Sequence, residues 1–480
     1  MDGKAVLHVL GALLLFLGAS LILPIIVSFY YNDGDSLPLL QSLFLIILIG
    51  LVAWRSTPAG RDLRIREGFA VVTFGWLIFA GLGCLPFVLA GRGISYTDAF
   101  FETMSGFTTT GATIMTDIES LPHGLLFWRS MTHWLGGMGI IVLSLAILPM
   151  LGIGGMQLFK AEVPGPVVDK LTPRIQDTAK NLWGVYVLLS LAETVLLLSG
   201  GMNLFDALCH TFGTMATGGF STKNSGMMFY NNLYIQYVVI MFMIIAGSNF
   251  SLHYRALKGD FKSYLENSEF KFYIGIISCA IFLIFLDLFF KKSYNISDAL
   301  VKSSFQVASL MTTTGFHNAD YETWSVSSQL ILVFLMFIGG CAGSTGGAIK
   351  VIRVLITTKF GLIQMKRLLH PSAVLPVRLG ARSIPDESVA DVLGFFLIYL
   401  IIFVFASIIM SLMGLDIITS VSTVISTLGN IGPGIGTIGP TENYAHIPVL
   451  GKWLLSFLML IGRLEIFTVL IIFYRHFWVK

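Results

Sequence analysis

The chain has 480 residues, of which 55% are hydrophobic and 12% charged, and its formal net charge is +3. With a mean hydropathy of +0.81, this composition excludes a soluble globular protein of this length and indicates an integral membrane protein. The small net charge gives no reason to expect a nucleic-acid partner.

Ten apolar stretches are each near the ~20 residues that a helix needs to cross the hydrocarbon core. In chain order they lie near residues 5–30, 38–54, 69–90, 124–149, 181–200, 232–252, 272–290, 328–349, 391–413 and 449–473. The first could be taken for a signal peptide. It is too long, however, and it lacks both a strongly basic start and a clear cleavage site, so we expect a retained helix.

The basic residues predict how the chain is oriented in the membrane. Four loops hold 19 of the 30 Lys and Arg residues, and they lie near 55–66, 160–180, 255–271 and 350–382. By the positive-inside rule these loops are cytoplasmic. Ten spans then place both termini on the same side, which agrees with Lys4, Arg475 and Lys480 near the ends.

Four short polar segments rich in Thr, Gly and Asn interrupt the apolar sequence, and each lies between two long apolar stretches. They are Thr108–Thr113, Ala216–Ser221, Thr312–Phe316 and Gly429–Gly434. Small residues free the backbone to point carbonyl oxygens at a common axis, where these can replace the water around a cation. A single such segment would be read as an ordinary turn. Four matched segments instead predict a pore with four similar quarters.

The segments belong to a repeat of about one hundred residues. Each has a loop glycine, and a short helix opening with an aspartate precedes it. The glycines are Gly111, Gly218, Gly315 and Gly432, and the aspartates, expected to cap the helices, are Asp98, Asp206, Asp298 and Asp416. The short helix can cross only half the membrane, so the segment must enter and leave on one face. The carboxyl ends of four such helices favour a cation at their centre.

We therefore expect an all-α polytopic membrane protein with a pseudo-fourfold pore. Two leading transmembrane helices are followed by four helix–pore loop–helix repeats. The expected boundaries are 1–68 for the leading helices and 69–160, 161–260, 261–382 and 383–480 for the repeats.

A glycine cluster lies in the closing span of the third repeat. It comprises Gly339, Gly340, Gly343, Gly346 and Gly347, with Ser344 and Thr345 among them. Each glycine costs a helix about 1 kcal/mol relative to alanine, so we expect this span to break within the membrane. Close helix packing through small residues is the alternative. Lys350, which follows the cluster, is either part of the same feature or an anchor at the membrane edge.

Arg463 lies within the last apolar stretch, where a charged side chain is costly and usually faces a cavity or a partner. A salt bridge to Glu465 is the alternative, although residues two apart on a helix point in different directions. Beneath a cation filter, the positive charge of Arg463 would act as an electrostatic barrier.

The remaining polar and sulfur-containing residues give weaker signals. Cys84, Cys209, Cys279 and Cys341 have no metal-ligand spacing and are expected to be packing residues. Glu193, His210 and Asp287 could form a proton relay, but no spacing links them, so solvated helix ends or satisfied core positions are expected. Gly152–Gly155 lacks the Lys and Ser/Thr of a phosphate loop. No group of residues indicates a catalytic site or an enzyme.

Several strings resemble the Trk/Ktr/HKT superfamily of cation transporters, specifically its TrkH/TrkG-type potassium uptake membrane subunits, over essentially the whole chain. They are Leu151–Gln157, Glu162–Pro166, Gly339–Gly347 and Gly462–Phe467. The resemblance implies a selectivity filter that binds K⁺ as the transported ion. Its expected residues are Thr109, Thr110, Gly111, Thr217, Gly218, Thr313, Thr314, Gly315, Asn430, Ile431 and Gly432.

In this family sodium-selective plant relatives have serine in place of the first-loop glycine, so Gly111 favours potassium. The fourth loop departs from the Thr-Thr-Gly pattern, as it does in bacterial members of this branch. The resemblance also implies that the glycine cluster and Arg463 form a gate beneath the filter, and we assign Lys350 to the same gate because it closes the cluster.

For the whole protein, the resemblance implies gated K⁺ uptake across the bacterial inner membrane by a homodimer in which each protomer has its own pore. It further implies a cytoplasmic regulatory subunit of the TrkA type that binds NAD(H) or adenine nucleotides and docks on the basic loops. A proton-coupled K⁺ symporter is the alternative. Four repeats in one orientation, with a single broken span expected, argue against alternating access between inverted repeats.

Overall fold

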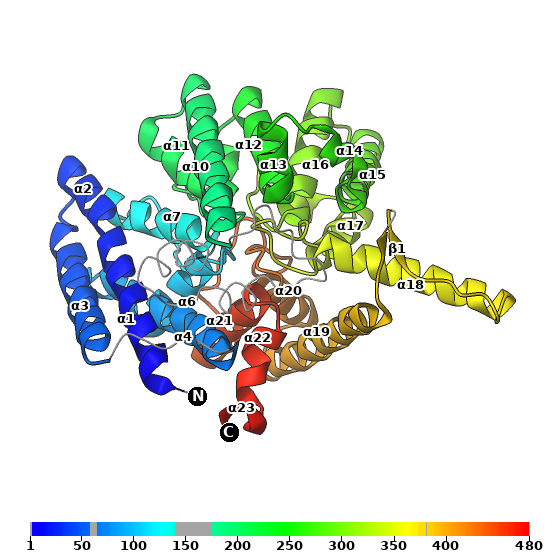
Figure 1. Ribbon diagram of the computed structural model, residues 1–480. Coiled ribbons are helices and arrows are strands. Elements are labelled where there is room, and N and C mark those ends of the chain that lie inside the picture. Colours follow the sequence, from blue (N-terminus) through cyan, green and yellow to red (C-terminus); the bar gives the residue numbers. More distant parts are fainter. Residues whose placement is uncertain (1, 58–64, 138, 140–174, 381, 480) are drawn as a thin grey trace.

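The computed structural model describes residues 2–57, 65–137, 139, 175–380 and 382–479. Helices arranged around central loops make up most of it, which confirms the predicted all-α class (Figure 1). The strands in these ranges are β1 (Arg378–Leu379) and β2 (Arg382–Ser383), which pair antiparallel. The strings Leu151–Gln157 and Glu162–Pro166 and the basic loop 160–180 lie wholly or mostly outside the described residues.

The leading helices are α1 (Gly3–Ser20), α2 (Ile22–Tyr31) and α3 (Ser36–Arg55). Close contact between α1 and α3 depends on glycine: a Cβ on Gly11 would lie 2.5 Å from the backbone nitrogen of Trp54. Small residues at such crossings let helix backbones approach within a membrane.

The elements of the four repeats follow one plan: a long helix, a short pore helix, a filter loop and a closing helix. The first repeat has α4 (Ile65–Gly83), α5 (Leu85–Leu89), pore helix α6 (Tyr96–Phe107) and α7 (His123–Gly137). The second has α10 (Ile175–Ser199), pore helix α11 (Leu204–Met215), η2 (Gly226–Phe229), α12 (Leu233–Ala246), α13 (Phe250–Leu257) and α14 (Lys262–Glu266).

The third and fourth repeats continue this plan. The third has α15 (Ser268–Lys291), pore helix α16 (Ile296–Met311), η3 (Tyr321–Thr323), α17 (Val326–Phe337) and α18 (Val351–Leu369). The fourth has α19 (Asp386–Leu412), pore helix α20 (Ile417–Leu428), α21 (Val449–Arg463), α22 (Phe467–Leu470), η4 (Ile471–Phe473) and α23 (Arg475–Trp478). Helix α18 projects away from the rest of the molecule (yellow in Figure 1).

Six described helices are long and apolar enough to cross a membrane, or eight if two sharply bent pairs each count as one span. The bent pairs correct our prediction of continuous helices over 232–252 and 449–473. The chain turns by 103° between α12 and α13 and by 113° between α21 and α22. The stretch 328–349 is helical only to Phe337, so the expected break there is confirmed. Among the described residues, the closing spans of the second, third and fourth repeats are therefore broken.

The helix caps differ from our prediction in three of the four pore helices. Only Asp416 is itself an N-cap, and its side chain accepts from the Thr419 backbone N–H. In the others the N-cap is the residue three positions before the aspartate, and it accepts from that aspartate's N–H. These caps are Ser95, Asn203 and Asn295. The aspartates Asp98, Asp206 and Asp298 complete a reciprocal pair in the first turn by accepting from the cap side chains.

Candidate ion pore

The four loops that the sequence predicts to form the filter, which we call the filter loops, share one backbone conformation. Immediately after the C-cap of its pore helix, each loop has a non-glycine residue with positive φ, and two positions later it has a glycine with positive φ. The first set is Thr109 (52°), Thr217 (53°), Thr313 (60°) and Asn430 (53°). The second set is Gly111 (80°), Gly219 (78°), Gly315 (81°) and Gly432 (98°). A left-handed non-glycine residue is strained, and its recurrence at matched positions indicates a functional constraint.

This register corrects our alignment of the second repeat. Gly219, not Gly218, corresponds to Gly111, and Gly218 takes the position of Thr110. The residue between the two left-handed positions donates its N–H to the pore helix in every loop. These bonds are Thr110 to Ser105, Gly218 to Gly213, Thr314 to Ser309 and Ile431 to Ser426, with lengths from 2.8 to 2.9 Å.

The four glycines close the loops into a ring. Each glycine packs against a carbonyl oxygen of the next loop, and an added Cβ would come within 1.9 to 2.6 Å of it. The pairs of glycine and carbonyl residue are Gly111 and Gly218, Gly219 and Thr314, Gly315 and Ile431, and Gly432 and Thr110. Each loop thus contacts the next loop through its glycine and the previous loop through a carbonyl. A side chain at any of the four glycines must therefore displace a carbonyl of the neighbouring loop.

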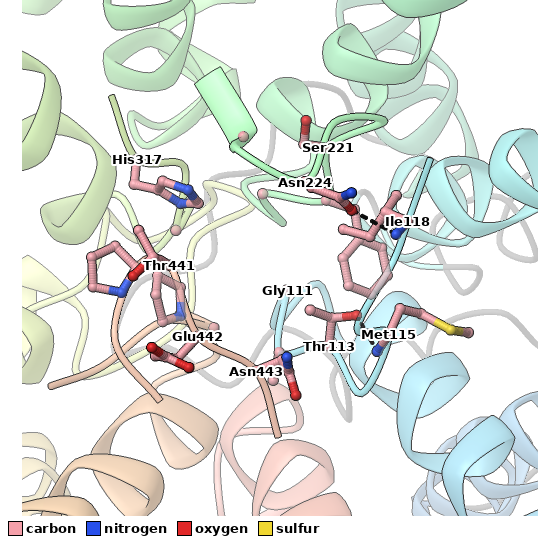
Figure 2. Close-up of a pocket in the computed structure, with 18 of the residues that line it drawn as sticks. Gly111, Thr113, Met115, Ile118, Ser221, Asn224, His317, Thr441, Glu442 and Asn443 are labelled. Carbon is pink, nitrogen blue, oxygen red and sulfur yellow. Dashed lines mark hydrogen bonds between the residues drawn. The ribbon is translucent and has the colours of Figure 1, made fainter. Parts of the chain in front are cut away.

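A cavity of 160 Å³ opens on the glycine end of the filter, and all four repeats line it. Figure 2 shows Thr113 of the first repeat, Ser221 of the second, His317 of the third and Glu442 of the fourth around this opening. We call it the mouth cavity. Its position gives an ion access to the ring of carbonyls from this side.

The fourth loop keeps the backbone conformation with a different side chain. The side chain of Asn430 is buried, and its Nδ2 donates to Thr110 Oγ1 at 3.0 Å and to the Met459 carbonyl at 2.9 Å. Asn430 thus ties the fourth filter quarter to the first.

Residues 338–350, which contain the predicted glycine cluster, form a loop between α17 and α18 that we call the inner loop. Its two ends meet, because Gly339 N donates to the Ile349 carbonyl at 2.9 Å and Ile338 pairs with Ile349. Glu269, at the start of α15, links the inner loop to the first turn of α18. Its Oε1 accepts from Ala342 N at 2.7 Å and from Ile352 N at 3.1 Å.

The inner loop contacts the pore-helix end of the filter, opposite the mouth cavity. Gly347 N donates to Thr313 Oγ1 at 2.7 Å, and a Cβ on Gly347 would lie 2.5 Å from the Gly429 carbonyl oxygen. Thr345 Oγ1 donates to the Met215 carbonyl at 3.1 Å. The loop therefore touches the second, third and fourth filter quarters at once.

Arg463 ends α21 and binds the inner loop. Its Nη1 donates to the Thr345 carbonyl at 2.7 Å, and its Nη2 donates to the carbonyls of Gly136 and Gly137 at 2.5 and 2.7 Å. The alternative pairing with Glu465 is wrong, because Glu465 forms a salt bridge with Arg353 of α18.

Lys350 is buried, and its Nζ donates to the Gly346 carbonyl of the same loop. A membrane-edge anchor would extend its ammonium toward water. The structure thus places Lys350 with the inner loop.

The residues that we set aside from the pore are mostly accounted for. Cys84, Cys209 and Cys341 are buried as expected, but Cys279 is exposed. Asp287 pairs with Lys291 at 2.8 Å, and His210 Nε2 lies 3.0 Å from Ser221 Oγ. Glu193 is the exception: it is fully buried in α10, and neither carboxylate oxygen has a hydrogen-bond partner among the described residues.

Three functional candidates escaped the sequence reasoning, namely Glu269, Glu102 and Arg129. Glu102 and Arg129 form an ion pair at 2.6 Å with side chains 0% and 2% exposed. Arg129 lies within the apolar stretch 124–149, so the argument that singled out Arg463 could also have found it. Nothing in the sequence links Glu269 to a loop some seventy residues away.

A model of a family of cation transport proteins, TrkH, matches residues 38–478 of the chain. The chain belongs to the TrkH family. The Trk system potassium uptake protein TrkH of Salmonella typhimurium is 41% identical over 483 residues, covering 100% of both chains. TrkG of Escherichia coli K12, also a Trk system potassium uptake protein, is 34% identical over 479 residues, covering 99% of this chain and 98% of the relative.

The fold is also similar to a solved structure of this family. The crystal structure of the potassium transporter TrkH from Vibrio parahaemolyticus matches with a TM-score of 0.90 at 38% identity, covering 100% of both chains. The chain is thus a multi-pass membrane protein built on the TrkH fold.

Proposed function

We propose that this protein takes up K⁺ through a channel-like pore whose four-loop filter binds the ion and whose inner loop is the gate. The ring of four glycines, each packed against the next loop's carbonyl, is the observation that carries the proposal. Such a ring fixes the carbonyl oxygens at positions where they can replace the water of a desolvated cation. The names of the relatives as potassium uptake proteins support K⁺ as that cation.

The filter residues are those expected from the sequence, with Gly219 added as the second-loop counterpart of Gly111. Main-chain oxygens of the four loops would bind K⁺. Asn430 positions its loop through Thr110 and Met459, so its side chain acts through the backbone.

The inner loop is proposed as the gate because it contacts the pore-helix end of the filter. Gly347 and Thr345 hydrogen-bond there, and Arg463 holds Thr345 from the side of α21. Opening requires these bonds to break together. The guanidinium of Arg463 adds an electrostatic barrier to a cation at the same place.

For the assembled system we propose a homodimer in the bacterial inner membrane with both termini cytoplasmic and one pore in each protomer. A TrkA-type cytoplasmic subunit that binds NAD(H) or adenine nucleotides would act on the basic loops. Helix α18 supports this view, because it joins the inner loop directly to Lys366 and Arg367 in its last turn. A partner that moves α18 would therefore move the gate.

The test is cation flux in liposomes that contain the purified protein, under a set membrane potential and pH. We expect K⁺ and Rb⁺ to pass and Na⁺ and Li⁺ to be excluded, with flux that follows voltage and carries no protons. Equal flux of all four ions would contradict the proposed filter.

Proton-coupled symport is the second candidate. The observation that favours it is the burial of Glu193, whose carboxylate has no hydrogen-bond partner in the part of the chain that the structure describes. Coupled flux would need a proton gradient and would carry H⁺ in a fixed ratio to K⁺. The variant Glu193→Gln separates the two candidates. It should abolish the proton dependence of a symporter and leave a pore's voltage dependence intact.

A further inference from the structure

Each pore helix supports its own filter loop through a side chain near its middle. Seven residues before the first left-handed filter residue, three of the helices carry a side chain that binds the loop where it leaves the filter. These contacts are Glu102 Oε2 to Ile114 N at 2.8 Å, His210 Nε2 to Ser221 Oγ at 3.0 Å and Gln306 Nε2 to Asn318 Oδ1 at 3.2 Å. In the fourth repeat Ser422 Oγ, one residue earlier, accepts from Ile435 N at 2.6 Å.

The first repeat differs, because its support is a carboxylate paired with an arginine. Arg129 of α7 donates from Nε to Glu102 Oε1 at 2.6 Å, and both side chains are buried. Arg129 also donates from Nη1 to the Ser221 carbonyl at 3.0 Å. Since Ser221 belongs to the second filter loop, the ion pair connects the first two filter quarters.

Further contacts of Arg129 reach the filter itself. Its guanidinium lies 3.5 Å from the ring centroid of Phe220, which stacks on His133 at 4.0 Å. His133 Nδ1 accepts from Phe220 N at 3.4 Å. The ring of His133 also lies close to Gly218, because a Cβ on Gly218 would be 2.5 Å from His133 Nδ1. The Gly218 carbonyl is the one that Gly111 touches in the glycine ring.

We propose that Glu102 and Arg129 are a positioning pair that sets the K⁺ selectivity of the pore by fixing the first two filter loops relative to each other. The pair acts through the Gly218 carbonyl and does not itself bind the ion. This inference rests on the proposed function of the filter. A buried ion pair adds little net stability but holds a defined geometry, and losing one partner leaves a buried charge unpaired.

The experiment measures Rb⁺ and Na⁺ flux in liposomes for Glu102→Gln, for Arg129→Lys and for the double variant Glu102→Gln/Arg129→Gln. Arg129→Lys keeps the charge but cannot hold Glu102 and the Ser221 carbonyl together. We expect the Na⁺/Rb⁺ flux ratio to rise about tenfold, which corresponds to about 1.4 kcal/mol of lost discrimination. The double variant leaves no buried charge unpaired, so it remains informative if Glu102→Gln does not fold.

The matched control is Asp98→Asn, which breaks the ion pair of Asp98 with Lys452, 2.5 Å apart, in the first turn of the same pore helix. It should lower the melting temperature without changing the flux ratio. If Arg129→Lys and the double variant fold and keep the wild-type ratio, the pair is only structural and the inference is wrong. A wild-type protein that does not discriminate Rb⁺ from Na⁺ would instead contradict the proposed filter, which separates the two failures.

Discussion

The proposed filter and the inner loop contact each other, but they differ in symmetry. The filter loops follow the fourfold repeat, whereas the inner loop does not. Each filter loop has the same pair of left-handed residues and the same contact to its neighbour. The inner loop is formed by the third repeat, and it contacts the filter quarters unequally through Thr345 and Gly347.

This difference separates two physical requirements. Surrounding an ion requires oxygens on all sides, so the constraint falls on every repeat and tolerates little variation. Blocking a path requires a single obstacle with two positions, and one repeat can supply it. Selectivity and gating should therefore respond to different mutations, and the predictions below test that separation in order of decreasing effect.

The largest effect is expected from Gly111→Ser. The new Cβ would lie 2.1 Å from the Gly218 carbonyl oxygen at a residue with φ of +80°, so the carbonyl must move and the ring must open. We expect Na⁺ to be admitted, with a rise of about tenfold or more in the Na⁺/K⁺ flux ratio. Gly34→Ser is the control, since its φ is +82° but no atom lies within 4 Å. Unchanged Na⁺ flux in the first variant would refute the filter assignment.

The gate should respond with a change in flux and not in selectivity. Shortening the loop between Gly339 and Gly347, or changing Arg463→Gln, removes contacts that hold the obstacle in place. We expect K⁺ flux to rise about threefold to tenfold at the wild-type Na⁺/K⁺ ratio. Arg66→Gln is the control, because Arg66 binds the Val479 carbonyl at 2.8 Å on the surface. Equal or lower flux in both gate variants would show that the inner loop is not a barrier.

A smaller effect is expected from Glu269→Ala. This variant removes the acceptor that Ala342 of the inner loop shares with Ile352 of α18, and it leaves the contacts of the loop to the filter in place. We expect about a twofold rise in K⁺ flux together with a lower melting temperature. Glu322→Ala is the matched control. Glu322 also accepts from a backbone N–H, that of Gly436 at 2.6 Å, but it makes this contact outside the inner loop. A rise in flux in both variants would point to general loosening of the protein.

The smallest effect is expected at Asp33, between α2 and α3, which belongs to neither region. The backbone N–H of His123 lowers the pKa of the Asp33 carboxyl, and the side chain of His123 acts in the same direction. A lowered folded-state pKa stabilises the protein above the unfolded pKa, and this contribution is lost as the pH falls through the folded pKa. Asp33→Asn should lower the melting temperature by about 1–2 °C near pH 7 and by less at about pH 2, below the ordinary Asp pKa of 3.8, with unchanged flux. A shift of equal size at both pH values would contradict this assignment.

Much of the architecture could be predicted from the sequence. Apolar length and repeated loop chemistry predicted an all-α membrane protein with four pore helices, and the glycine cluster predicted the break after Phe337. The predictions failed where short-range signals were ambiguous. The aspartates of three pore helices complete a cap but are not the cap, and the second-loop glycine is shifted by one residue because two glycines are adjacent.

Patterns along the chain therefore determined the membrane class and the four loops that we propose as the filter, because helix length and backbone freedom depend on local composition. The partners of the buried charges were decided only in three dimensions. Arg463 binds carbonyls of two distant segments, Glu465 pairs with Arg353, and Arg129 joins two filter loops. A buried charge must be satisfied by whatever polar group the fold brings near it, and these groups lie up to about three hundred residues away.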